Sequence, residues 1–236
     1  TVVALTHFGY IKRMPIDTYR SQKRGGKGIT GISTREEDFV KQIFTASTHD
    51  TILFFSNKGK LYRLRGYEIP EAGRTAKGTA IVNLLRLDNG EKISAVIPIT
   101  NFEDGKYLLM ATKNGLIKKT ALKDFDSTRK TGLLSITLKD DDELIDVRLT
   151  DGEDNVVLVT SKGLSITFDE KDVRPVGRSA QGVIGIRLDE KDFVIGMESI
   201  IASKDATLLA ITEHGFGKRT ELSEYRVQNR GGRGVI

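Results

Sequence analysis

The sequence predicts an all-β, propeller-like fold of five modules, and three observations support this prediction. An apolar, β-rich run that ends in Thr or Ser and is followed by a glycine recurs five times along the 236 residues. A second glycine follows each of these marker glycines at a nearly constant distance. Helical periodicity is hard to find anywhere in the chain. Modules of about 50 residues with about four strands each are typical of propeller blades.

Each module is predicted to open with a β-hairpin at its marker glycine. The markers are Gly9, Gly59, Gly115, Gly163 and Gly215, which lie 50, 56, 48 and 52 residues apart. Segments such as Lys113-Asn114-Gly115 place Asn and Gly where a tight hairpin needs a positive φ. The modules span roughly residues 1–49, 50–105, 106–152, 153–205 and 206–236, and we expect them to form a single domain.

A loop with a second glycine and a short apolar strand follows each hairpin. These glycines are Gly28, Gly78, Gly132, Gly182 and Gly234, which lie 19, 19, 17, 19 and 19 residues after their markers. An acidic connector and a last strand complete the module. A β-sandwich is the alternative fold, but a sandwich does not require the same order of strands five times.

The composition excludes several classes of protein. The chain has no cysteine, which excludes disulfides and thiolate zinc sites and suits a reducing cytosol. No apolar run approaches the roughly 18 residues that a membrane-spanning helix needs, and the start carries no secretion signal. The chain begins without Met, so we expect a fragment of a larger, soluble protein.

Charge alternates along the chain. The net charge of the whole chain is +5, but residues 1–35 alone carry +6 and the connector 140–152 carries −5. We therefore expect one basic and one acidic face. The fourth module carries −1 over residues 153–189, so it should contribute least to any binding of an anion.

A cationic glycine motif in the first module predicts a phosphate-binding loop. Glycines let the backbone N–H groups approach an anion closely, while the neighbouring cations add charge-assisted hydrogen bonds. A solvated, mobile glycine loop is the alternative, but a similar motif recurs at residues 228–234. The residues of the first motif are Gln22, Lys23, Arg24, Gly25, Gly26, Lys27 and Gly28.

Further cations recur at two places in the modules, on the strand after the marker glycine and in the loop before the second glycine. A row of exposed cations on a curved body would suit the phosphate backbone of a bent duplex. The predicted rim residues are Lys12, Arg13, Lys60, Arg63, Arg65, Arg74, Lys77, Lys118, Lys119, Arg129, Lys130, Arg178, Lys218, Arg219, Arg230 and Arg233.

No residue is predicted to be catalytic, and no metal or cofactor site is expected in this chain. His7, His49 and His214 occupy unrelated module positions without a ligand partner two or four residues away. No complete nucleotide-binding GxxxxGK[ST] motif is present.

The chain resembles the C-terminal domain of the DNA gyrase A protein over essentially its whole length. Residues 22–28 are similar to the GyrA box of that family, Gln-Arg-Arg-Gly-Gly-Lys-Gly, and differ only at Lys23. The resemblance implies a β-pinwheel, a propeller-like disc in which neighbouring blades exchange a strand. The family usually has six blades, whereas five modules are visible here.

The resemblance also implies a function. A non-catalytic domain of this kind wraps duplex DNA around its outer edge, so that the ATP-dependent type II topoisomerase introduces negative supercoils. ATP and Mg²⁺ would be used by other parts of the enzyme, which joins two gyrase A and two gyrase B proteins. We expect a bacterial, cytoplasmic, nucleoid-associated protein with no membrane contact, whose isolated domain is monomeric.

Two alternatives stay open at this point. Topoisomerase IV has a related domain, although its GyrA box is degenerate or absent. A propeller with a basic face could instead bind an acidic partner protein, which predicts weak DNA binding that does not depend on duplex length.

Overall fold

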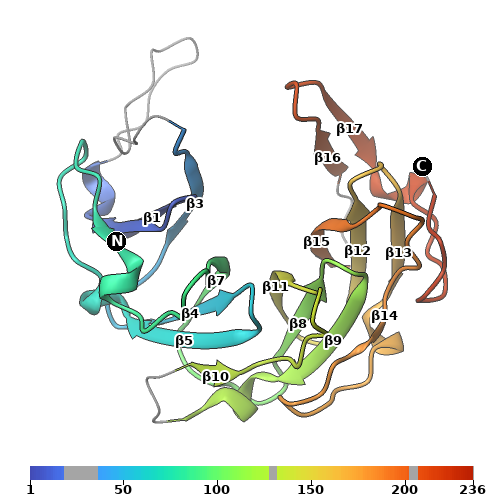
Figure 1. Cartoon of the computed structure of the whole chain (residues 1–236), viewed down its shortest axis with the longest axis horizontal. Coiled ribbons are helices and arrows are strands. Elements are labelled where there is room, and N and C mark those ends of the chain that lie inside the picture. The colour runs from blue at the N-terminus through green and yellow to red at the C-terminus, as the bar shows by residue number, and fades with distance from the viewer. Residues whose placement is uncertain (19–36, 128–131, 202–206, 236) are drawn as a thin grey trace. The chain divides into compact units, whose positions relative to one another are not determined.

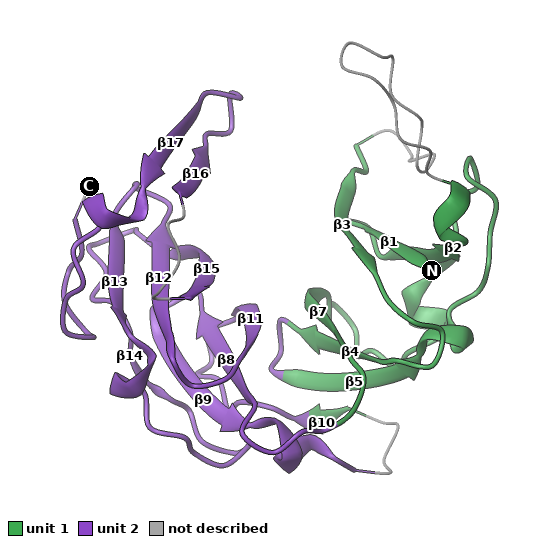
Figure 2. Cartoon of the chain, turned by 180° about the vertical axis from the view of Figure 1, so that it is seen from behind, with its two compact units in different colours: residues 1–56, 60–101, 128–133 green, residues 57–59, 102–127, 134–236 purple. Residues whose placement is uncertain are grey.

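The computed structural model describes residues 1–18, 37–127, 132–201 and 207–235 (Figure 1). These residues form two compact units, coloured separately in Figure 2. The first unit comprises residues 1–56, 60–101 and 128–133, and the second comprises residues 57–59, 102–127 and 134–236. In the described part of the chain the only helices are short 3₁₀ turns, so the prediction of an all-β fold is confirmed.

The strands of the first unit build two four-stranded sheets, with the orders β3-β1-β2-β6 and β10-β5-β4-β7. Strand β10 (Leu133–Leu134) belongs to the second of these sheets, although only its first residue, Leu133, is part of the first unit. The other strands are β1 (Val2–Thr6), β2 (Tyr10–Met14), β3 (Val40–Thr45), β4 (Thr51–Ser56), β5 (Lys60–Arg65), β6 (Thr79–Ala80) and β7 (Ile93–Ile99). The 3₁₀ turns are η1 (Ile16–Thr18), η2 (Gly66–Glu68) and η3 (Ile81–Asn83).

The second unit contains sheets of four, three and two strands, with the orders β11-β8-β9-β14, β13-β12-β15 and β16-β17. An antiparallel bridge between Ser165 and Val235 stands in the place of a fourth strand beside β13. The strands are β8 (Tyr107–Thr112), β9 (Leu116–Ala121), β11 (Leu144–Thr150), β12 (Asp154–Thr160), β13 (Ser165–Asp169), β14 (Val183–Ile184), β15 (Val194–Ile201), β16 (Thr207–Ile211) and β17 (Gly217–Glu221). The 3₁₀ turns are η4 (Leu122–Phe125), η5 (Glu170–Asp172) and η6 (Leu222–Glu224).

Neighbouring modules exchange a strand, as the resemblance implied. Strand β6 follows the second hairpin in the chain but pairs with β2 of the first, in the register Ile11 to Thr79. In the same way β14 of the fourth module pairs with β9 of the third. Each of these blades therefore receives its outer strand from the module that follows it.

In the second and fourth modules, the second glycine makes this exchange sterically possible. Gly78 has a φ of +88°, and a Cβ built there would lie 2.5 Å from the Ile11 carbonyl oxygen. Gly182 has a φ of +95°, and its Cβ would lie 2.6 Å from the Ile117 carbonyl oxygen. Only a residue without a Cβ fits a backbone in this conformation at this distance.

The recurring Thr and the acidic connector both stabilise the hairpin turn. In the third module the Thr112 hydroxyl oxygen accepts a hydrogen bond from the Leu116 N–H at 3.1 Å. The buried Asp142 carboxylate accepts one from the Asn114 N–H at 2.9 Å. Asp38 and Asp192 make the equivalent bonds in the first and fourth modules. Part of the negative charge of the connectors therefore serves the fold and is not presented on a surface.

The first strands of the hairpins form the cores because both of their faces are covered. Every residue of β1 and of β4 is buried, as expected for apolar runs that do not alternate with polar residues. Phe54, Ile52 and Ile11 lie in one core within the first unit. Leu158 and Phe168 lie in a separate core within the second.

Asp146 on β11 should make the stability of the second unit depend on pH. Burial raises the pKa of this carboxyl from 3.8 to about 6, and Arg148, whose guanidinium lies 2.9 Å away, opposes the rise. Because the folded state binds the proton more tightly, this contribution to stability is complete below pH 4 and is lost as the pH rises through 6.

We therefore expect the unfolding free energy of the wild type, relative to Asp146→Asn, to fall by about 2–3 kcal/mol between pH 4 and pH 7. Chemical denaturation at each pH measures this difference. The exposed Asp140→Asn is the matched control. A difference that stays constant with pH would contradict the expectation.

Candidate nucleic-acid interface

The predicted phosphate-binding motif, Gln22 to Gly28, lies outside the described residues, as do Arg129 and Lys130. Their role in binding therefore stays a prediction from the sequence. The structure does describe the equivalent loops of the second, fourth and fifth modules. Each of these loops lies directly before an exchanged strand or bridge.

In the first unit, the loop before β6 presents two exposed cations. Arg74 and Lys77 form no side-chain hydrogen bond or ion pair with any described residue. The bond from the Ala72 N–H to the Arg13 carbonyl holds the start of the loop, and the bond from the Ala76 N–H to the Gly73 carbonyl closes a turn within it. Two unpaired side-chain charges are thus carried on a fixed backbone.

In the second unit, the loop before β14 carries Arg178, which is half-buried. Within the described part of the chain its guanidinium has no hydrogen bond or ion pair, whereas its backbone carbonyl accepts a bond from Lys118. Arg174 lies four residues earlier, exposed and likewise unpaired among the described residues. This loop also offers positive charge to an external anion.

The second motif, residues 228–234, is anchored to the fourth blade by its backbone. The Gln228 N–H donates to the Thr167 carbonyl at 2.7 Å, and the Gly231 N–H donates to the Gly185 carbonyl at 2.8 Å. Arg233 is exposed and pairs with none of the described residues. Arg230 instead donates to the carbonyls of Asp172 at 3.2 Å and of Ile184 at 2.5 Å.

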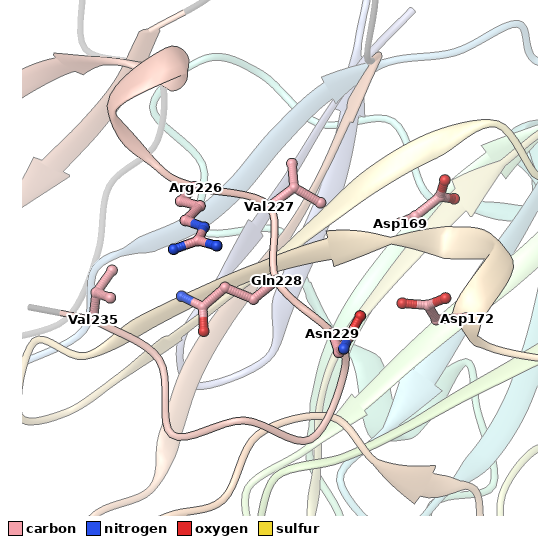
Figure 3. A pocket seen from close by; sticks show the side chains of 7 residues that line it. All are labelled: Asp169, Asp172, Arg226, Val227, Gln228, Asn229 and Val235. Atoms are coloured by element: carbon pink, nitrogen blue, oxygen red, sulfur yellow. The ribbon is translucent and has the colours of Figure 1, made fainter.

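A groove of about 640 Å³ lies beside this second motif (Figure 3). Asp169 and Asp172 lie on one side of it, and Arg226 and Gln228 lie on the other. Its remaining lining residues are Val227, Asn229 and Val235. Two carboxylates disfavour a phosphate inside the groove, so the candidate phosphate contacts are the exposed cations of the loops.

Three predicted rim residues are buried, which corrects the expectation that they belong to an exposed row. Lys12 and Lys118 are 0% exposed and Lys119 is 4% exposed. The Lys12 ammonium donates to the carbonyls of Gly73, Arg74 and Ala76 at 2.6–3.0 Å. The Lys119 ammonium donates to the Glu170 carbonyl at 3.0 Å and lies 3.6 Å from the Glu170 carboxylate. These cations bind the protein's own backbone and cannot reach a duplex.

The other strand cations are divided between paired and unpaired side chains. Arg13 forms an ion pair with Glu71 at 2.6 Å, Lys60 forms one with Asp88 at 2.5 Å, and Arg65 donates to the His49 carbonyl. Arg63, Lys218 and Arg219 have no such partner in the described ranges. Because Lys218 and Arg219 are consecutive on β17, their side chains point to opposite faces of that hairpin.

Among the described residues, the list of predicted cations missed four exposed arginines, Arg86, Arg174, Arg187 and Arg226. Arg174 and Arg226 both stand eight residues before the second glycine of their module. This shared position could have identified them in the sequence. Arg187 follows β14, and its backbone N–H donates to the Gly232 carbonyl at 2.8 Å.

Among the described residues, no cluster of three or more His, Cys, Asp or Glu side chains is arranged to hold a metal ion. The same residues include no helix that is both long enough and apolar enough to cross a membrane.

Comparison with known proteins shows similarity to one family over nearly the whole chain. The family model described as "DNA gyrase C-terminal domain, beta-propeller" matches residues 1–47, 50–100, 106–151, 154–201 and 206–236. These five segments coincide closely with the five predicted modules. The DNA gyrase A protein of Clostridium acetobutylicum is 56% identical over 235 residues, which cover 100% of this chain and 28% of that relative.

Solved structures support the same relationship. A structure of the DNA gyrase A C-terminal domain matches with a TM-score of 0.82 and 31% identity, covering 99% of this chain and 75% of that one. A C-terminal domain of DNA topoisomerase IV matches with a TM-score of 0.81 and 35% identity, covering 100% of this chain and 71% of that one.

The chain spans less than a third of the length of the curated gyrase relative that it matches. The family model, the gyrase A relative and the solved gyrase domain agree with one another. The resemblance found in the sequence is therefore confirmed, and the chain belongs to the DNA gyrase C-terminal domain family.

Proposed function

We propose that this chain is the part of a DNA gyrase A protein that binds, bends and wraps duplex DNA. The observation that carries the proposal is the set of exposed or half-exposed, unpaired cations on loops that precede an exchanged strand or bridge. Arg74, Lys77, Arg178 and Arg233 hold these positions in three different modules. Family membership supports the same assignment.

The binding mechanism follows from the chemistry of these side chains. Lysine and arginine on short loops neutralise phosphates and release counterions, but they carry little information about base sequence. Bending the duplex costs on the order of several kcal/mol per few tens of base pairs, and many phosphate contacts together offset this cost. We expect binding that falls steeply with salt and depends weakly on sequence.

Within the complete enzyme, the wrap would fix the sense of the DNA crossing, so that ATP-driven strand passage introduces negative supercoils. The assembly would contain two gyrase A and two gyrase B proteins in the bacterial cytoplasm, associated with the nucleoid. In this proposal ATP and Mg²⁺ are used by the rest of the enzyme. This chain contributes neither a catalytic residue nor a bound cofactor.

Religation of a nicked plasmid in the presence of the chain tests the proposal. We expect a change in linking number of one sign that grows with the ratio of protein to DNA. The variant Arg74→Ala/Lys77→Ala/Arg178→Ala/Arg233→Ala should lose most of this change. Binding without any change in linking number would overturn wrapping. Binding that does not depend on duplex length would favour the acidic-protein alternative.

A further inference from the structure

The side chain three residues after each of the first four marker glycines lies against the loop that the next module contributes. We call this position the slot. Lys12 contacts the loop before β6, and Lys118 contacts the loop before β14. A Cβ on Gly132 would lie 2.9 Å from the Tyr62 ring, and one on Gly232 would lie 3.4 Å from Ile166. The slot therefore lies next to a loop in each of the four blades, although its residue differs.

Where the slot holds lysine, a buried ammonium bonds to the backbone of the loop. Lys12 uses all three of its N–H donors on loop carbonyls. Lys118 donates to the Ser135 carbonyl at 2.6 Å and to the Arg178 carbonyl at 2.5 Å. Neither ammonium has an ion pair with a carboxylate in the described part of the chain. Burying a charge without a counter-charge is costly, so these backbone bonds must hold it in place.

The arginine four residues before the second glycine makes different hydrogen bonds where the slot holds lysine and where it holds isoleucine. Above a lysine, the carbonyls of Arg74 and Arg178 are the acceptors, and their guanidinium groups form no bond to the described residues. Above Ile166, it is the guanidinium of Arg230 that bonds to backbone carbonyls, those of Asp172 and Ile184.

We propose that the slot residue decides whether the loop arginine is available to bind phosphate. A lysine in the slot keeps Arg74 and Arg178 free, whereas Ile166 leaves Arg230 bonded to its own protein. Lys12 and Lys118 are thus positioning residues that act on DNA through another side chain. This proposal rests on the proposed function, because it takes the loop arginines as phosphate ligands.

Two physical effects explain the action of the lysine. Its ammonium bonds to carbonyls of the loop and so fixes the backbone that carries the arginine. It also repels a second cation, and the pKa of Lys118 reflects the proximity of Arg178. Burial, and to a smaller extent Arg178, lower the pKa of Lys118 to about 8, while Asp124 acts in the opposite direction. Ile166 has neither effect, and the guanidinium of Arg230 bonds to the carbonyls of Asp172 and Ile184, which lie outside its own loop.

The first test compares three alanine variants of the 236-residue chain, Arg74→Ala, Arg178→Ala and Arg230→Ala. Binding to a duplex of about 40 base pairs is titrated at several salt concentrations. The salt slope should fall by about one for Arg74→Ala and for Arg178→Ala. It should not change for Arg230→Ala. An equal fall for Arg230→Ala would overturn the proposal, whereas no fall for any variant would overturn phosphate binding by these loops.

The second test replaces Lys118, the slot residue of the third blade, by isoleucine, which is the slot residue of the fourth blade. Lys118→Ile should weaken duplex binding about threefold to tenfold and lower the salt slope as Arg178→Ala does, although Lys118 is buried. The double variant Lys118→Ile/Arg178→Ala should bind about as well as either single variant, because both changes remove the same contact. Additive losses would overturn the proposal. If Lys118→Ile does not fold, the alanine comparison decides alone.

Discussion

Supercoiling should be lost when Lys23, Arg24 and Lys27 are all replaced by alanine in the complete gyrase A protein. These three cations accompany the glycines of the first motif, which is similar to the GyrA box and is predicted to hold one end of the wrap. Without that anchor the duplex still binds the remaining loops, but the sense of the crossing is no longer fixed. The rate of ATP-dependent supercoiling should fall by about 100-fold or more, because three charge-assisted phosphate contacts are removed together.

Relaxation of supercoiled plasmid by the same enzyme should continue, since strand passage itself does not need the wrap. Gel electrophoresis of plasmid topoisomers measures both reactions. A matched control removes the same charge elsewhere, by Lys58→Ala, Lys123→Ala and Lys171→Ala. All three side chains are exposed and lie outside the loops that precede the second glycines. Lys123 and Lys171 form surface ion pairs with Asp104 and Glu153. Supercoiling that survives in the box variant, or is lost in the control, would contradict the anchor.

A single methyl group at Gly182 should unfold the edge of the third blade. Alanine there would bring its Cβ to 2.6 Å from the Ile117 carbonyl oxygen at a φ of +95°, so neither the contact nor the backbone angle can be kept. We expect a loss of about 2–4 kcal/mol in the free energy of unfolding. The exchanged strand β14 should detach, which would release the loop that carries Arg178 and weaken duplex binding as well.

Gly177 supplies the matched control in the same loop. It has nothing within 4 Å of a built Cβ and no positive φ, so Gly177→Ala should change the stability by less than about 1 kcal/mol. Gly78 and Gly73 form an equivalent pair in the first unit. Urea unfolding followed by circular dichroism measures all four variants. Equal stability of Gly182→Ala and Gly177→Ala would show that strand exchange does not depend on the glycine.

The repeated architecture could be predicted from the sequence because its cause is local. A hairpin glycine and a second glycine about 19 residues later are both required by backbone geometry, and each leaves a mark at a fixed place in the module. The identity of the exposed cations could not be predicted in the same way. Neighbouring residues of a strand point to opposite faces, so Lys12 and Arg13 share a segment but not an environment.

The buried lysines show why the charge pattern alone was misleading. A lysine is normally assigned to the surface, and Lys12 and Lys118 had no nearby carboxylate in the sequence to suggest otherwise. Their partners are backbone carbonyls, brought into place only when the following module folds onto the blade. Arg74, Lys77, Arg178 and Arg233 lie on exposed or half-exposed loops, and glycine neighbours mark those loops in the sequence.

Strand exchange also has a consequence for the order in which the polypeptide matures on the ribosome. Because β6 completes the sheet of β1 and β2, and β14 completes that of β8 and β9, neither blade can close while it is the newest one to emerge. In the first blade, the edge of β2 stays unpaired until β6 has been translated, which is some seventy residues later, from Tyr10 to Ala80. Nascent chains of this design would always expose one unfinished edge, which is the kind of surface that chaperones bind.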